Sequence, residues 1–191
     1  NSLTMLNQKV AGFLLKSLGW KAGEPIAPEK KCIILGVPHT SVWDLVISYL
    51  YYRSVGGDAR VMVKKEFFFW PRGPIIRWMG GIPVDRSRKG GATLVRQMVE
   101  AFEKEETFHL AIAPEGTRKG VTKWKAGFHT IARTANVPVY MGYYDWRRKI
   151  VGRGQKVELT DDAKADLARI QKLYHELDLG AKYPENYKTG Y

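Results

Sequence analysis

Two short apolar runs that stop at prolines constrain the fold of this chain more than any other feature. Residues 32–37 and 108–113 are apolar almost throughout, and each run is followed by a proline and then by polar residues. Runs of this length, bounded by proline, are typical of strands that are buried on both faces. Such strands occur in parallel sheets covered by helices, so the sequence predicts an α/β fold.

Helical and strand patterns alternate along the rest of the chain. In residues 92–106, apolar side chains recur with the spacing of an amphipathic helix, and we expect Glu100 and Glu103 on its solvated face. The other predicted elements are helices at 42–54, 127–136 and 160–178, short helical turns at 67–79, strands at 59–63, 82–84 and 137–143, and a hairpin of 147–154 with 155–159. Thr160 is the predicted N-cap of the last helix.

The length and composition fit one globular domain. With 191 residues, 45% of them hydrophobic and 26% charged, the chain is long enough for one core and too apolar for a disordered protein. Strands separated by helices predict a single domain over residues 1–191, with a largely parallel central sheet flanked by helices. The single cysteine, Cys32, excludes an internal disulfide framework and a cysteine-rich metal site.

Basic residues concentrate in the middle of the chain. The formal net charge is +12, and residues 118–153 hold nine basic residues against Asp145 alone. Residues 53–88 hold eight basic and three acidic residues, whereas residues 154–191 are nearly neutral. A positive field of this kind attracts nucleic acid, an anionic lipid surface or phosphorylated small molecules. Composition leaves these three classes of partner open.

The first 22 residues carry an apolar stretch that Lys9 and Lys16 interrupt. We expect this segment either to lie in the headgroup layer of a membrane as an amphipathic segment or to pack on the domain's own core. The sequence contains no run of about 18 apolar residues, so we expect no membrane-spanning helix of the usual kind. The segment lacks a small-residue cleavage site, so we expect no signal peptide.

His39 and Asp44 follow the first apolar run with the spacing H-x-x-x-x-D. On a regular helix, side chains five residues apart point about 140° away from each other. A contact between them therefore requires His39 in the loop and Asp44 in the first helical turn, and Ser41 three residues before Asp44 resembles a capping box. Two interpretations follow: Asp44 caps a helix beside a loop histidine, or the pair is a general base oriented by a carboxylate.

A second polar cluster, with Glu115, Gly116, Thr117 and Arg118, follows the other apolar run. Because the ends of parallel strands meet at one edge of a sheet, we expect both clusters on the same edge. The cluster is either a turn in which Gly116 adopts a positive φ, or a site where Arg118 binds a phosphate. Arg86, near the end of the predicted strand at 82–84, is likewise either a surface residue after a short strand or a second residue that binds a phosphate.

These polar segments, taken in order, resemble the glycerolipid acyltransferase family typified by lysophosphatidate (1-acylglycerol-3-phosphate) acyltransferase. His39 and Asp44 match the H-x4-D block of that family. Residues 81–86 resemble its second block, residues 114–118 match its Pro-Glu-Gly-Thr-Arg block, and residues 137–139 match the start of its fourth. The resemblance spans residues 32–142.

The resemblance implies transfer of a fatty acyl group from acyl-CoA or acyl-carrier protein to the hydroxyl of a lysophospholipid or a glycerol-phosphate-type acceptor. His39 would deprotonate that hydroxyl and Asp44 would orient His39, with no covalent enzyme intermediate, no cofactor and no metal. Arg86 and the four residues Glu115, Gly116, Thr117 and Arg118 would line the site of the acceptor phosphate. We therefore expect a peripheral enzyme on the cytoplasmic face of a membrane.

The sequence departs from the family where Lys119 replaces a frequent serine and where residues 140–142 lack a second proline. Both departures leave the acceptor open, with a lysophospholipid, glycerol phosphate or another hydroxyl or amine as alternatives. A basic nucleic-acid-binding domain and a His/Asp-dependent hydrolase are the rival interpretations. The sequence lacks the signatures of common nucleic-acid-binding modules, so we expect no nucleic acid as a partner. It also lacks the G-x-S-x-G elbow of a hydrolase. We expect His109, His129 and His175 to be structural or exposed.

Overall fold

The computed structural model describes residues 6–85, 87 and 91–191. Its elements, in chain order, are α1 (Gln8–Ser17), β1 (Lys21–Ala22), β2 (Lys31–Leu35), α2 (Trp43–Ser54), β3 (Ala59–Lys64), η1 (Lys65–Phe67), α3 (Arg72–Trp78), β4 (Gly81–Val84), α4 (Gly91–Lys104), β5 (Phe108–Ile112), α5 (Gly127–Ala135), β6 (Val139–Tyr140), β7 (Tyr143–Asp145), β8 (Ile150–Gly152), β9 (Lys156–Val157), α6 (Ala163–Leu177) and η2 (Pro184–Asn186).

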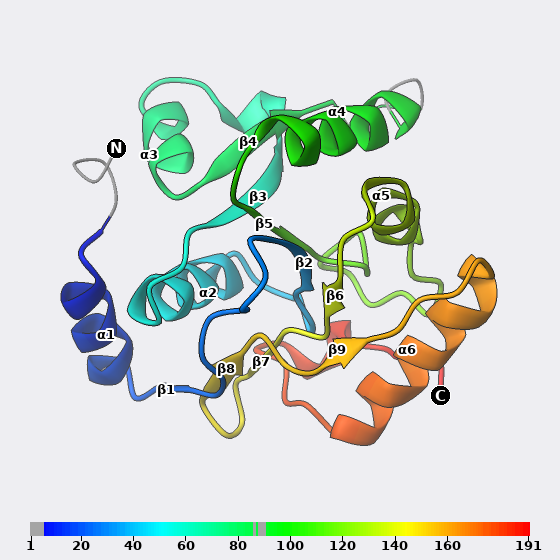
Figure 1. Cartoon of the computed structure of the whole chain (residues 1–191). Coiled ribbons are helices and arrows are strands. Elements are labelled where there is room, and N and C mark those ends of the chain that lie inside the picture. Colours follow the sequence, from blue (N-terminus) through cyan, green and yellow to red (C-terminus); the bar gives the residue numbers. More distant parts are fainter. Residues whose placement is uncertain (1–5, 86, 88–90) are drawn as a thin grey trace.

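Six strands form the central sheet in the order β4-β3-β5-β2-β6-β9. All neighbours are parallel except the short β9, which is antiparallel to β6. In the register, Ile33 of β2 lies opposite Leu110 of β5 and Val139 of β6. The two apolar runs are therefore adjacent central strands whose carboxyl ends share one edge, which confirms the predicted α/β fold (Figure 1).

Strand β2 supplies side chains to both faces of the sheet because successive residues alternate. Ile33 and Leu35 enter the core cluster that also contains buried residues of α4, α5 and α6. Cys32 and Ile34 enter the opposite cluster, with buried residues of α1 and α2. The helices thus cover the sheet from two sides (Figure 1).

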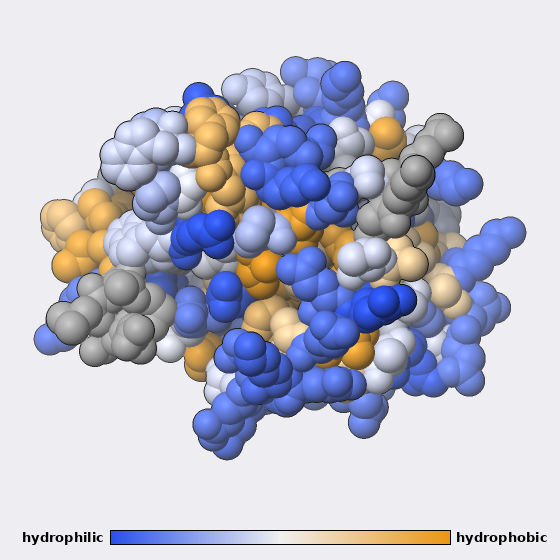
Figure 2. Space-filling view, turned by 90° about the horizontal axis from the view of Figure 1, so that it is seen from above, coloured by the Kyte–Doolittle hydropathy of each residue, from blue (hydrophilic) through white to orange (hydrophobic). Residues whose placement is uncertain are grey.

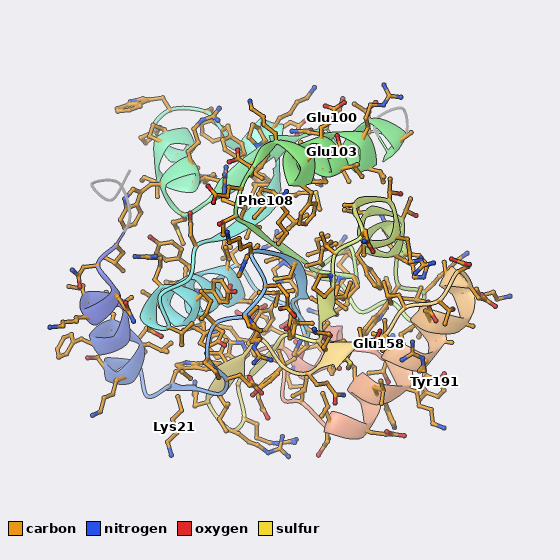
Figure 3. All side chains as sticks on the ribbon, in the orientation of Figure 1. Lys21, Glu100, Glu103, Phe108, Glu158 and Tyr191 are labelled. Carbon is orange, nitrogen blue, oxygen red and sulfur yellow. The ribbon has the colours of Figure 1, made fainter. Side chains whose placement is uncertain are left out.

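The charged face of α4 lies where the periodicity predicts it. Glu100 and Glu103 are exposed, and both project from the outer side of α4 in Figure 3. Met98 and Phe102 on the other side of the same helix are buried in the core.

The predicted strand 137–143 is wrong as one element, because the chain changes sheets at Gly142. Strand β6 belongs to the central sheet, whereas β7 pairs with β8 in a second sheet of order β1-β8-β7. A side chain at Gly142 would start 2.2 Å from the backbone oxygen of Leu35. Glycine is therefore required where the chain crosses the end of β2, and this contact cannot be inferred from local apolarity.

Two further local predictions need correction. The expected hairpin of 147–154 with 155–159 does not form, since β8 pairs with β7 and β9 pairs with β6. The N-cap of α6 is Asp162, whose carboxylate accepts the Ala165 amide at 3.0 Å. The predicted cap, Thr160, instead donates its hydroxyl to Asp166 at 2.9 Å. An aspartate two residues further along was the stronger cap, because its carboxylate reaches the first free amides of the helix.

Helix α1 has one inner and one outer apolar face. Ala11 and Leu15 are buried in the cluster shared with α2, whereas the ring of Phe13 is 70% exposed. The helix therefore packs on the domain's own core and also presents apolar side chains outward. Among the described residues, no helix combines the length and apolarity that crossing a membrane requires.

Candidate active site

The structure brings His39 and Asp44 into contact. Helix α2 begins at Trp43, so Asp44 lies in its first turn, and His39 lies in the loop after β2. The Nδ1 atom of His39 is 3.2 Å from Oδ2 of Asp44. The carboxylate is fully buried, while the imidazole is 26% exposed. The imidazole is thus partly accessible, while its Nδ1 atom contacts a buried acid.

Asp44 also organises the turn that carries His39. Its Oδ2 accepts the amides of Thr40 and Ser41, each at 2.9 Å, and the Ser41 hydroxyl oxygen accepts the amide of Trp43 at 3.1 Å. These reciprocal bonds resemble a capping box, as the sequence predicts. The two interpretations of Asp44 are therefore compatible, since the carboxylate that satisfies the turn also contacts the imidazole.

Glu115 joins the loop after β5 to the loop after β2. Its Oε1 accepts the backbone N–H of His39 at 2.7 Å, and the side chain is buried. Burial raises the pKa of Glu115 to about 8, and the nearby negative charge of Asp44 acts in the same direction, while the hydrogen bond from His39 opposes them. Glu115 is therefore mostly a neutral acid near pH 7 that holds the backbone of His39.

The rest of the second polar cluster forms the turn after Glu115. Gly116 has a φ of +73°, the positive value that the turn interpretation predicts. The Thr117 hydroxyl oxygen accepts the amide of Lys119 at 3.2 Å. Arg118 is exposed and makes no ion pair with any described residue, which leaves its guanidinium available to an anion.

The predicted residue Arg86 lies outside the described residues. Strand β4, which precedes it, is three positions from β2 in the sheet, roughly 14 Å at a strand spacing of ~4.8 Å. Asp85, the residue after β4, is exposed, and its carboxylate accepts the Ser87 amide at 2.9 Å. That hydrogen bond, with help from Lys65, lowers the pKa of Asp85.

Sequence reasoning missed Trp146, which donates its indole Nε1–H to Oδ1 of Asp44 at 2.7 Å. It also missed the contact of Thr40 with the C-terminal segment, where the Thr40 hydroxyl oxygen accepts the amide of Tyr183 at 3.1 Å. Both partners are more than 100 residues from the first cluster. No local pattern in the sequence could have indicated either contact.

The other histidines have structural partners, as expected. His129 contacts Asp166 at 2.8 Å in the core, and His175 contacts Thr189 at 2.9 Å. His109 lies between Tyr52 and the backbone oxygen of Glu29, and burial lowers its pKa. In the described part of the chain, no three His, Cys, Asp or Glu residues lie close enough to hold a metal ion.

Two cavities lie away from the His39–Asp44 pair. The larger, of about 540 Å³, lies between α6 and the C-terminal segment, with Tyr174 and Tyr187 in its wall. The smaller, of about 280 Å³, lies beside β4 and α4, with Ile82 and Phe108 in its wall. Neither cavity is lined by His39, so neither is a slot for an acyl chain beside the imidazole.

The fold and the site define a class of protein. A largely parallel sheet whose strand ends present a histidine, a buried acid and an arginine without an ion pair among the described residues is suited to general-base chemistry on an anionic substrate. Residues 21–144 match the model of the acyltransferase family. That match covers well over half of the chain, and the chain belongs to the acyltransferase family. The resemblance to the glycerolipid acyltransferases is thereby confirmed.

A solved structure has a similar fold. The 1-acyl-sn-glycerophosphate (LPA) acyltransferase PlsC from Thermotoga maritima matches with a TM-score of 0.57 and 18% sequence identity. The match covers 92% of this chain and 80% of that chain. A search of the curated proteins finds no match. The structural likeness agrees with the central sheet and flanking helices described above.

Proposed function

We propose that this protein transfers a fatty acyl group from a thioester, acyl-CoA or acyl-carrier protein, to the hydroxyl of a lysophospholipid or glycerol-phosphate-type acceptor. The contact between the partly exposed His39 and the buried Asp44 is the observation that carries this proposal. Membership of the acyltransferase family favours it over nucleic-acid binding and over hydrolysis. A 1-acylglycerol-3-phosphate is the acceptor that we consider first.

His39 acts as the general base in this proposal. Because Nδ1 faces Asp44, Nε2 is the atom that accepts a proton from the acceptor hydroxyl. The resulting alkoxide attacks the thioester carbonyl, the C–S bond breaks, and the imidazolium returns its proton to the leaving thiolate. Asp44 stabilises the imidazolium between these steps. Neither a covalent enzyme intermediate nor a cofactor is required.

Arg118 is the residue of the described chain best placed to bind the acceptor phosphate. It is exposed and free of ion pairs within the described residues, and it follows Glu115 by three positions. We propose that Arg86 assists it, as the family resemblance implies, and that Gly116 and Thr117 shape the turn between them. Glu115 positions His39 through its backbone, and its neutral form does not repel a phosphate.

We propose that the protein works at a membrane surface, on its cytoplasmic face and without crossing it. Large apolar side chains are exposed on α1 and in the segment from η1 to α3: Val10, Phe13, Leu14, Leu18, Phe67, Phe69, Trp70, Ile75 and Trp78. We call this set the apolar surface. Figure 2 shows hydrophobic side chains gathered among hydrophilic ones on the side of α3 and α4. Apolar rings beside basic side chains suit the headgroup layer of an anionic bilayer.

Basic groups lie over an aromatic ring of this surface, Phe69, and over the neighbouring ring of Phe68. The guanidinium of Arg72 lies 5.3 Å from the ring centre of Phe69, and that of Arg77 lies 4.9 Å from the ring centre of Phe68. These cations therefore enter the interface together with the rings, where anionic lipid compensates their charge.

Product analysis tests this function. The purified protein is incubated with long-chain acyl-CoA or acyl-carrier protein and a panel of lysophosphatidate, other lysophospholipids and glycerol 3-phosphate. We expect thiol release and an acylated product with at least one phosphorylated acceptor, identified by mass spectrometry. Thioester loss that yields free fatty acid with every acceptor would instead support the hydrolase.

A further inference from the structure

The carboxylate of Asp44 is held by more than the turn that carries it. Its Oδ2 contacts the His39 imidazole and accepts two backbone amides, whereas its Oδ1 accepts only the indole N–H of Trp146, at 2.7 Å. Asp44 is fully buried, so no bulk water replaces a missing donor. Among the described residues, Trp146 is the one side chain that fixes the second oxygen of this acid. It lies beyond the segment that matches the family model.

The backbone around Trp146 is fixed on both sides. Strand β7 runs beside the loop after β2, where the amide of Tyr144 donates to the backbone oxygen of Val37 at 3.0 Å. The amide of Trp146 then donates to the backbone oxygen of Gly180 at 2.7 Å. The second sheet therefore places the indole beside Asp44.

The indole ring is enclosed by aromatic and cationic groups. The ring of Trp20 meets it edge to face at 4.8 Å between centres. The ammonium groups of Lys149 and Lys182 lie 4.8 Å and 4.5 Å from its centre. Cations at this distance are attracted to the ring face and restrict its orientation. The N–H is therefore held toward Asp44.

We propose that Trp146 is a positioning residue for acyl transfer, which fixes the Asp44 carboxylate so that Oδ2 faces His39. This inference rests on the proposed role of His39 as general base. Without the indole N–H, Oδ1 of the buried carboxylate would have no donor within the described residues, and a misplaced carboxylate would orient the imidazole less well.

The test compares Trp146→Phe, which removes the N–H and keeps a ring, with Trp124→Phe. Trp124 is a suitable control because its Nε1–H donates to the backbone oxygen of Lys188 at 3.0 Å, so the same kind of bond is lost elsewhere. Because the lost hydrogen bond is made to a charged group, we expect Trp146→Phe to lower kcat about 10-fold or more. The KM of the acceptor should stay unchanged. Trp124→Phe should leave kcat close to the wild-type value.

A kcat that stays as in the wild type in folded Trp146→Phe would overturn this inference. An equal loss of kcat in both tryptophan variants would also overturn it, because that is the result of a merely structural role. If Trp146→Phe does not fold, Trp146→His, which retains an N–H on a ring, is measured in its place. We expect its kcat to stay within about 10-fold of the wild-type value, and a larger loss would count against the inference. His39→Ala separates the two proposals, since full turnover in that variant would contradict the role of His39 as general base, whereas a failure of Trp146→Phe alone would contradict only the role of Trp146.

Discussion

Glu115 links the geometry of the site to a pH dependence of stability. The pKa of Glu115 is about 8 in the folded chain, against an ordinary value of 4.5. At pH 7 the folded protein therefore holds a proton on Glu115 that the unfolded chain has already released. The stabilising contribution is complete below about pH 4.5 and is lost as the pH rises through about 8. Each unit of pKa difference corresponds to about 1.4 kcal/mol. The effect therefore amounts to a few kcal/mol.

Glu115→Gln removes this proton uptake and retains an oxygen that accepts the His39 amide. We expect the free energy of unfolding of the wild type, measured in urea, to fall relative to that of the variant between pH 5 and pH 8. Parallel pH dependences in the two proteins would show that Glu115 is ionised when folded.

Arg118 is expected to act on acceptor binding and not on the proton transfer. Arg118→Ala removes the guanidinium that pairs with phosphate. It should therefore raise the KM of the acceptor about 10-fold or more, with a small effect on kcat. Lys119→Ala is the matched control, because Lys119 is an exposed neighbour on the same turn. Steady-state kinetics with a phosphorylated acceptor measure both constants. Equal KM values in the two variants would contradict a specific role for Arg118.

At the residue scale, the sequence predicts those contacts that are local. The pairing of His39 with Asp44 is confirmed, because a strand end followed by a capping motif leaves few arrangements for five residues. The positive φ of Gly116 is confirmed for the same reason. Trp146 has no local signal, since it reaches Asp44 only after the second sheet has formed.

The N-terminus of α6 provides a prediction at the scale of the element. Asp162 accepts the amide of Ala165 at 3.0 Å, so Asp162→Ala should lower the free energy of unfolding by about 1 kcal/mol. Asp161→Ala is the control, because Asp161 is highly exposed and, in the part of the chain that the structure describes, forms an ion pair with Arg133 alone. Exposed ion pairs contribute about 0–1 kcal/mol, so its loss should be smaller. Urea unfolding compares the two, and equal losses would contradict the assigned cap.

Elements with a strong apolar pattern are predicted from sequence, and those that depend on distant contacts are not. Strands β2 and β5 are confirmed because a buried run between prolines is a complete local signal. The split of β6 from β7 depends on the close approach of Gly142 to Leu35. The pairing of β8 with β7 in the second sheet likewise depends on tertiary contacts.

At the scale of the whole molecule, the apolar surface predicts binding to anionic vesicles. Phe13 is 70% and Trp70 is 82% exposed, and burying such a ring contributes about 1.5–3 kcal/mol. We expect Phe13→Ser and Trp70→Ser each to weaken binding about 10-fold or more in cosedimentation. Leu177→Ser on α6 is the control, because Leu177 is an exposed apolar residue outside this surface.

Salt distinguishes the charged part of this binding from the apolar part. Added salt screens exposed charges, so binding should weaken as the ionic strength rises and should be weaker on neutral vesicles. Binding that is unaffected by both serine substitutions would contradict the apolar surface as the site of contact.

The turnover of His39→Ala shows whether acyl transfer depends on the imidazole. Thiol release from long-chain acyl-CoA is measured with the acceptor that the wild-type protein uses, after circular dichroism and thermal unfolding have shown that the variant is folded. Loss of a general base should lower kcat about 10²–10⁴-fold. Wild-type turnover in the folded variant would contradict the account, because acyl transfer would then not depend on the imidazole that Asp44 holds.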